Sequence, residues 1–176
     1  MAEHIIGMNS LDSKLNNLQD LSGALEKVIG REIRRVRNSA VLLCPVNHGE
    51  LRQSINTMVE REGDTIIGTC YTNNEHAGYV EFGTGPKGAA DHQGISPLVQ
   101  PSYVYEAWWF PGDNIPPSDA EMYHWPKFVT EEGKILYRTN GQPAQPYMYP
   151  ALKQNEPTIL ANIKSALQSD IRNEGS

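Results

Sequence analysis

The sequence has little of several features that define whole classes of protein. It contains only two cysteines, Cys44 and Cys70, in no CxxC pair, so it indicates neither a disulfide framework nor a zinc knuckle and predicts reduced, buried thiols. No apolar run approaches the roughly 20 residues of a membrane-spanning helix. The first residues lack the basic-then-apolar order of a signal peptide. The sequence therefore predicts a soluble protein made in a cytoplasm, with no membrane partner.

Basic residues are also scarce. Fifteen Lys and Arg face 21 Asp and Glu, which gives a formal net charge of -6. A protein that coats nucleic acid neutralises phosphates with Lys and Arg, so this balance disfavours such a role and leaves only local or transient contact with DNA. With 176 residues, 39% of them hydrophobic, the chain suits a single domain, residues 1–176, with a real core.

Two helices and a hairpin are predicted around this core. Residues 10–44 contain no proline and carry an apolar stripe with helical spacing, which predicts a long amphipathic helix with Gly23 and Gly30 as places for a bend. Pro45 ends it. Leu51 to Gln53 predict a short helix, and the β-branched segments 54–60 and 65–70 predict an antiparallel hairpin. Residues 77–85 are consistent with a strand or a helical turn.

A second helix is expected to begin near Pro150, with Leu160, Ile163, Leu167 and Ile171 on one face. Pro157 predicts a kink in it, or a restart at Asn155 or Glu156. The fold class is therefore α+β, with the amino-terminal and carboxy-terminal helices packed on a small antiparallel sheet.

Residues 86–142 differ in composition from the rest of the chain. They hold 7 of the 12 prolines, all three tryptophans and 9 of the 14 aromatic residues. Such a stretch is too aromatic for a solvated linker and too rich in proline for regular helix, so we interpret it as an insertion of short strands and ordered loop. Residues 103–110 and 130–139 within it could form a hairpin arm.

Motifs for catalysis and cofactor binding are largely missing. The five histidines lack metal-ligand spacing and the chain has no nucleophile elbow, so we expect no catalytic residue, metal or cofactor. Gly83 to Gly88 resemble a phosphate-cradling loop without its GK[ST] ending. His48, His76 and Glu81 could serve a small hydrolase or nuclease, with or without a metal, but no third group accompanies them.

Two clusters are candidate interfaces. Arg31, Arg34 and Arg35 lie opposite the apolar stripe of the first helix, which is typical of a solvated face. Alternatively, they dock on an acidic surface of a neighbouring subunit or on DNA phosphates. The second cluster is aromatic and forms either a local core of the insertion or a partner interface: Trp108, Trp109, Phe110, Tyr123 and Trp125. Exposed tryptophans also suit a module that binds carbohydrate or a host receptor.

Three separated signatures then line up in the chain: PVNHGELRQSI (residues 45–55), GYVEFGT (residues 78–84) and QPYMYPAL (residues 145–152). Their order after a long helix resembles the bacteriophage head-tail joining and tail-completion family of long-tailed phages. The sequence departs from that pattern at His48, Tyr147 and Tyr149. From the residues themselves, we expect Gly49, Gly83 and Gly85 to permit positive-φ turns. Arg52 and Glu81 are candidate partners for an ion pair, the alternative being unpaired charges that face solvent.

The resemblance implies a small structural virion protein of the phage neck or tail end and no enzyme activity. Its partners would be copies of itself, often in a hexameric ring, together with the tail tube or terminator and the head connector. It would be made in the cytoplasm of the host bacterium. The residues implied to carry the motif are Pro45, Gly49, Arg52, Glu81, Gly83, Thr84, Pro146 and Pro150.

Overall fold

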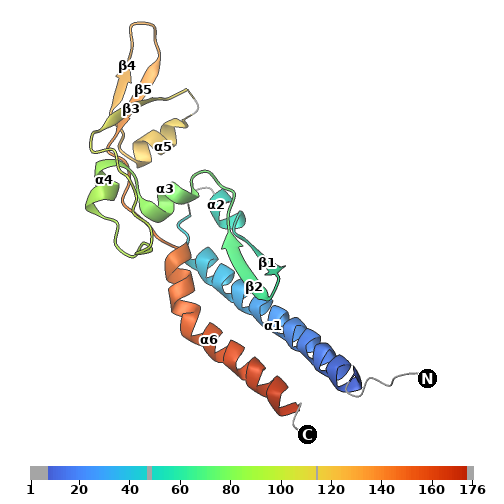
Figure 1. The fold of residues 1–176 in the computed structure, drawn as a ribbon. Coiled ribbons are helices and arrows are strands. Elements are labelled where there is room, and N and C mark those ends of the chain that lie inside the picture. Colours follow the sequence, from blue (N-terminus) through green and yellow to red (C-terminus); the bar gives the residue numbers. More distant parts are fainter. Residues whose placement is uncertain (1–7, 47–48, 114, 174–176) are drawn as a thin grey trace, which may run out of the picture. The chain divides into compact units, whose positions relative to one another are not determined.

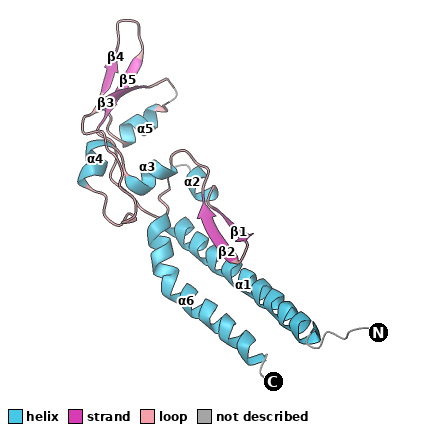
Figure 2. Ribbon diagram, in the orientation of Figure 1, coloured by secondary structure: helices cyan, strands magenta, loops and turns pink. Residues whose placement is uncertain are grey.

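The structure, a computed structural model, describes residues 8–46, 49–113 and 115–173, and the side chains of helical residues from 21 to 169. It confirms the α+β class: helices at both ends of the chain and small antiparallel sheets between them (Figures 1 and 2). The chain forms two compact units. Residues 1–43, 52–73 and 151–176 make the first, and residues 44–51 and 74–150 make the second. The expected single domain stays a prediction.

The first unit is built on α1 (Met8–Leu43), which confirms the long amino-terminal helix. The helix runs without a break through Gly23 and Gly30 and ends before Pro45, which cannot donate the next backbone hydrogen bond. The short helix α2 (Glu50–Gln53) follows. The side chains of Leu11, Leu15 and Leu18, expected in the apolar stripe, lie outside the described residues.

The predicted hairpin is present and packs on α1. Strand β1 (Asn56–Glu62) pairs antiparallel with β2 (Thr65–Tyr71) around the two-residue turn at Gly63 and Asp64. Val59 lies opposite Gly68 in this pairing. A Cβ atom at Gly68 would lie 2.8 Å from Ile29 Cγ2, so the glycine lets the strand approach the helix closely.

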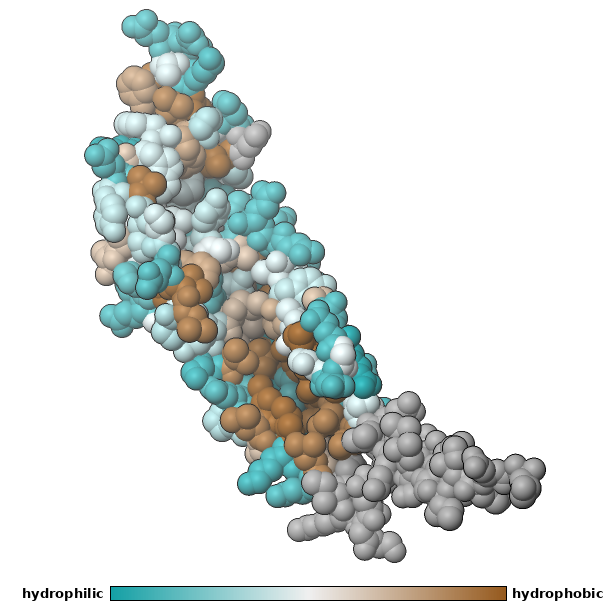
Figure 3. Space-filling view, in the orientation of Figure 1, coloured by the Kyte–Doolittle hydropathy of each residue, from teal (hydrophilic) through white to brown (hydrophobic). Residues whose placement is uncertain are grey.

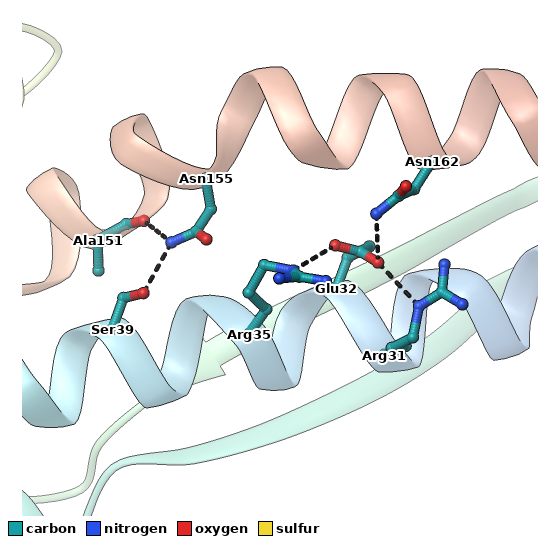
Figure 4. Close-up of polar contacts among 7 residues, drawn as sticks. All are labelled: Arg31, Glu32, Arg35, Ser39, Ala151, Asn155 and Asn162. Atoms are coloured by element: carbon teal, nitrogen blue, oxygen red, sulfur yellow. Dashed lines mark hydrogen bonds and ion pairs between the residues drawn. The ribbon is translucent and has the colours of Figure 1, made fainter.

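The carboxy-terminal helix α6 (Met148–Asn173) lies along α1 on a different side from the hairpin (Figures 1 and 4). It begins two residues before the expected start and continues through Pro157 without a restart. Asn155 Nδ2 donates hydrogen bonds to Ser39 Oγ (2.9 Å) and Ala151 O (2.8 Å). No helix among the described residues is long and apolar enough to cross a membrane.

The second unit contains three short helices, α3 (Ala77–Phe82), α4 (Gly85–Ala90) and α5 (Pro117–Met122). The segment left open between strand and helix is therefore helical. Its sheet has the strands β3 (Trp108–Pro111), β4 (Lys127–Val129) and β5 (Ile135–Thr139) in the antiparallel order β3-β5-β4. Where we expected a two-stranded arm, the insertion thus carries a third strand on the other side of β5.

The end of α5 positions the centre of the aromatic cluster. His124 has a φ of 53°, in the left-handed region that usually requires glycine. Its N–H donates to Glu121 O (3.1 Å), and the next N–H, of Trp125, donates to Ala120 O (3.0 Å). This pair of bonds is the Schellman ending of a helix, which reverses the chain and brings the residue after the turn back over the helix. Trp125 is thereby placed against buried Ala120.

Candidate functional site

The second and third sequence signatures meet at the carboxylate of Glu81. Glu81 lies near the end of α3, and only 6% of its surface is exposed. Its Oε2 atom accepts hydrogen bonds from the backbone N–H groups of Tyr147 (2.7 Å) and Met148 (3.0 Å), and its Oε1 atom accepts one from Tyr149 (3.0 Å). One buried side chain therefore binds three successive backbone donors at the start of α6.

These donors are the ones that the first turn of a helix leaves without an internal partner. The fourth such position is Pro150, which has no N–H group. With three donors bound by the carboxylate and the fourth absent, no backbone N–H group of the first turn lacks an acceptor. The negative charge also lies where the peptide dipoles of the helix favour an anion. Hydrogen bonds to a charged acceptor contribute about 1.5–3 kcal/mol each. Glu81 thus fixes where α6 begins.

The chain crosses its own backbone closely just after α3. Gly83 has φ 75° and ψ 174°, a conformation almost restricted to glycine. A Cβ atom there would lie 2.7 Å from Ala144 N and 2.9 Å from Gln142 O. Thr84 and Gln142 exchange two backbone hydrogen bonds, of 2.9 and 3.1 Å. The two ends of the segment 86–142 are therefore joined at this crossing.

The glycines of the phosphate-like loop serve the same close packing. Gly85 and Gly88 are both buried residues of the short helix α4. A Cβ atom at Gly85 would lie 2.6 Å from Trp108 Cζ3, and one at Gly88 would lie 2.8 Å from Gly83 C. The backbone N–H groups of Thr84, Lys87 and Gly88, which a phosphate would need, donate to carbonyl groups of the chain. The positive φ angles expected of Gly49, Gly83 and Gly85 are present, at 85°, 75° and 60°.

The aromatic residues fall on two faces of the three-stranded sheet. On one face Trp125 contacts Phe110 edge to face, with ring centroids 5.0 Å apart, and stacks on Tyr123 at 4.9 Å. Tyr137, only 5% exposed, lies against both Phe110 and Trp125. Such offset and edge contacts contribute about 0.5–1.5 kcal/mol each beyond area burial. This face is a small aromatic core.

The other face of the sheet remains uncovered within the described residues. Trp109, directly after half-buried Trp108, is 48% exposed and contacts Phe128, which is 54% exposed, at a centroid distance of 6.0 Å. Successive residues of a strand point to opposite faces, so the two tryptophans have different environments. The structure brings Phe110, Tyr123 and Trp125 together and leaves Trp109 outside.

Two of the three candidate arginines bind a buried acid. Glu32, 1% exposed, accepts hydrogen bonds at 2.9 Å from the Nε atoms of Arg31 and Arg35 and from Asn162 Nδ2 of α6 (Figure 4). The sequence alone did not identify Glu32 as a buried acid. The sequence signal for a buried acid was a glutamate between arginines at the edge of the apolar stripe. The third hydrogen-bond partner of Glu32, Asn162, lies 130 positions away in the sequence. Arg34 is exposed and has no such contact with Glu32.

Two opposing effects set the pKa of Glu32. Burial raises it by disfavouring the charged form, while the hydrogen bonds from Arg31, Arg35 and Asn162 lower it. The donors outweigh burial, and the pKa of Glu32 lies below its ordinary value of 4.5. Glu32 is therefore an anion at neutral pH and connects α1 to α6.

The remaining motif residues lie at turns and helix boundaries. Pro45 follows the end of α1, Gly49 precedes α2, and Arg52 lies within α2. Pro146 precedes α6, and a Cβ atom at Gly94 would lie 3.3 Å from its Cγ. The candidate ion pair of Arg52 with Glu81 stays a prediction.

The residues of the hydrolase hypothesis do not converge in what the structure describes. His48 lies outside the described residues. The Glu81 carboxylate is occupied by backbone donors, and His76 is exposed beside Tyr79. A cavity of about 170 Å³ is lined by Pro126, Arg138, Thr139 and Asn140, with no acid–base pair. Among the described residues, no group of three or more His, Cys, Asp or Glu could hold a metal ion.

Comparison with known proteins bears on the first half of the chain. The model of the family described as "Bacteriophage HK97-gp10, putative tail-component" matches residues 9–83. This range covers α1, the hairpin and α3, and it includes the first signature and most of the second. The resemblance to a phage tail-component family is thereby confirmed over these residues, which make up less than half of the chain. No curated protein and no solved structure matches the chain.

The close crossing at Gly83 predicts a large cost for any side chain there. We expect Gly83→Ala to lower the free energy of unfolding by roughly 3–5 kcal/mol, since backbone strain of 1–3 kcal/mol adds to overpacking of similar size. Gly133→Ala is the matched control, because Gly133 has a similar φ of 79° with nothing within 4 Å of its Cβ position. Urea unfolding measures both. Equal losses in the two variants would show that the contacts at Gly83 contribute nothing.

The acid Glu32 predicts a pH-dependent contribution to stability. Its pKa is lowered on folding, so the stabilisation is complete well above pH 4.5 and is lost as pH falls through the lowered value. We expect Glu32→Gln to cost about 1–3 kcal/mol at neutral pH and little in acid. Exposed Glu26→Gln, on the same helix, should cost little at either pH. Unfolding curves at both pH values test this, and a pH-independent loss would contradict it.

Proposed function

We propose that this chain is a structural virion protein of the phage neck or tail end. It would join or complete the tail at the head connector by assembling as a ring with copies of itself and with proteins of the tail tube or terminator and the connector. The match of residues 9–83 to a phage tail-component family supports the tail assignment. The surface of the first unit supports the assembly part of the proposal.

The observation that carries the assembly proposal is an apolar seam along α1 and α6. Aliphatic side chains along both helices leave an apolar area that is only partly buried, and Leu160 is 61% exposed. Figure 3 shows the area in brown. Large exposed apolar patches mark interaction sites in soluble proteins. The seam residues are Leu21, Leu25, Val28, Leu160, Ile163 and Leu167.

The roles of the motif residues support a protein that is not an enzyme. The carboxylate of Glu81 binds backbone N–H groups, and Gly83 and Thr84 join two segments of chain. Each is used for packing and turning the chain. The net charge of -6 also suits a ring through which DNA passes transiently, because like charge disfavours capture of phosphates.

The insertion, residues 86–142, would contribute a second contact surface within one folding domain of residues 1–176. Trp109 and Phe128 are exposed beside one another on its sheet, and aromatic residues of this kind are common at the energetic centres of interfaces. A neighbouring tail or connector protein would cover them.

Self-association is the test of this function. We expect sedimentation velocity to detect oligomers whose fraction rises with protein concentration. Leu160→Ser should shift the distribution toward monomer, because a leucine that is 61% exposed in one chain becomes buried on assembly. Leu98→Ser is the control, at a leucine that is 93% exposed in the second unit. A wild-type protein that stays monomeric at every concentration would contradict the proposal, and turnover of a substrate by that monomer would favour the hydrolase alternative.

A further inference from the structure

Three sides of α1 can be told apart by their contacts in the first unit. One side meets the hairpin, through Ile29 and Ile33 next to Gly68. A second side meets α6, through Glu32 and Ser39. The third side carries residues spaced by three or four positions, which share one face of a helix. All five are exposed, and we call them the basic stripe: Lys27, Arg31, Arg34, Asn38 and Leu42.

The basic stripe keeps unneutralised charge. Arg31 shares Glu32 with Arg35, but in the part of the chain that the structure describes no ion pair joins Lys27 or Arg34 to an acid. The Cα atoms of Lys27 and Arg34 are about 10.5 Å apart along the helix axis, because an α-helix rises about 1.5 Å per residue. The stripe ends in Leu42, which is 80% exposed. It is thus cationic over its first two turns and apolar at its end.

The hairpin has an outer face with the opposite charge. The side chains that alternate away from α1 include Glu60 and Glu62, both exposed, and the turn adds exposed Asp64. Neither glutamate has an ion-pair partner among the residues described. On the same face Ile67, 38% exposed, lies opposite Glu60, and Met58, 40% exposed, lies nearer the base of the hairpin. We call this set the acidic face.

Both surfaces run in the same direction along the unit. The tip of the hairpin lies beside the amino-terminal part of α1, where Arg61 Nη1 donates to Ser22 Oγ (2.8 Å). Its base lies beside the carboxy-terminal part, where Arg37 Nε donates to Ile55 O (3.0 Å). The charged end of each surface is therefore at the same end of the unit, and the apolar end of each at the other.

We propose that the acidic face of one copy docks on the basic stripe of the next copy, with the two copies parallel. Asp64, Glu62 and Glu60 then oppose Lys27, Arg31 and Arg34 in that order, and Met58 lies toward Leu42. Complementary charges of this kind set the register and the partner of an interface. Because the two surfaces differ, each copy offers both, and repetition generates a closed ring or a filament. This inference rests on the proposed function and specifies a second self-contact beside the apolar seam.

Charge reversal tests the contact with two single variants. We expect Arg34→Glu and Glu60→Arg each to raise the dissociation constant for self-association by at least about tenfold, since each places like charges opposite one another. An equimolar mixture of the two variants restores assembly, because every contact between unlike variants again pairs opposite charges. The double variant R34E/E60R restores it within one chain. Lys164→Glu, at an exposed position on α6, is the matched control and should change little.

Sedimentation velocity on the full chain reads out each variant, with far-UV circular dichroism to check that the helices persist. Wild-type association should also weaken near 1 M salt, where the Debye length is about 3 Å. If the wild type assembles and no reversal alters it, the docking is wrong while the proposed function stands. If the wild type never assembles, both fail. If Arg34→Glu abolishes binding of duplex DNA but not assembly, the stripe contacts nucleic acid and the inference is overturned.

Discussion

The second unit depends on one buried carboxylate bound to three backbone donors. Without an acceptor, the N–H groups of Tyr147, Met148 and Tyr149 would lie partly or wholly buried and unpaired, at a cost of about 1–3 kcal/mol each. Glu81 removes that cost and sets the first residue of α6. The adjacent bond from Gln145 N to Val80 O (2.8 Å) fixes the approach of the chain. Two signatures far apart in sequence are therefore parts of one structural element.

The same constraint explains why the motif residues bear no sign of catalysis. A carboxylate that accepts three backbone hydrogen bonds has little capacity left to bind a substrate. The glycines near it allow other backbone segments of the chain to approach closely. What the second unit presents to its surroundings is shape and exposed side chains such as Trp109 and Phe128. The first unit presents an apolar seam and two charged faces. Both suit a protein that works by fitting against neighbours.

The sequence predicted the elements whose signal is local. The long helix follows from the periodic apolar residues between positions 10 and 44 and from Pro45, and the hairpin from β-branched segments around Gly63 and Asp64. Residues 77–85 stayed ambiguous because a short apolar run has no distinct period. Strand β4 was missed because three residues, Lys127 to Val129, become a strand only by pairing with β5.

The contacts at the site were beyond prediction for a different reason. Glu81 accepts hydrogen bonds from backbone N–H groups. The identities of the side chains of Tyr147 and Tyr149 therefore give no indication of these hydrogen bonds. In the sequence Glu32 lies between arginines, which is also typical of a solvated acid. It is the packing of α6, which supplies Asn162, that distinguishes it as a buried acid. The charge pattern of the sequence therefore indicated candidate residues but did not indicate their hydrogen-bond partners.

Amide hydrogen exchange at the start of α6 tests the role of Glu81 most directly. We predict slow exchange at Tyr147, Met148 and Tyr149 in the wild type. In Glu81→Gln, whose amide has one acceptor oxygen, exchange at these three amides should be much faster, while that in β1 and β2 stays unchanged. Equally fast exchange at the three amides in the wild type and the variant would contradict the claim that this carboxylate holds the helix.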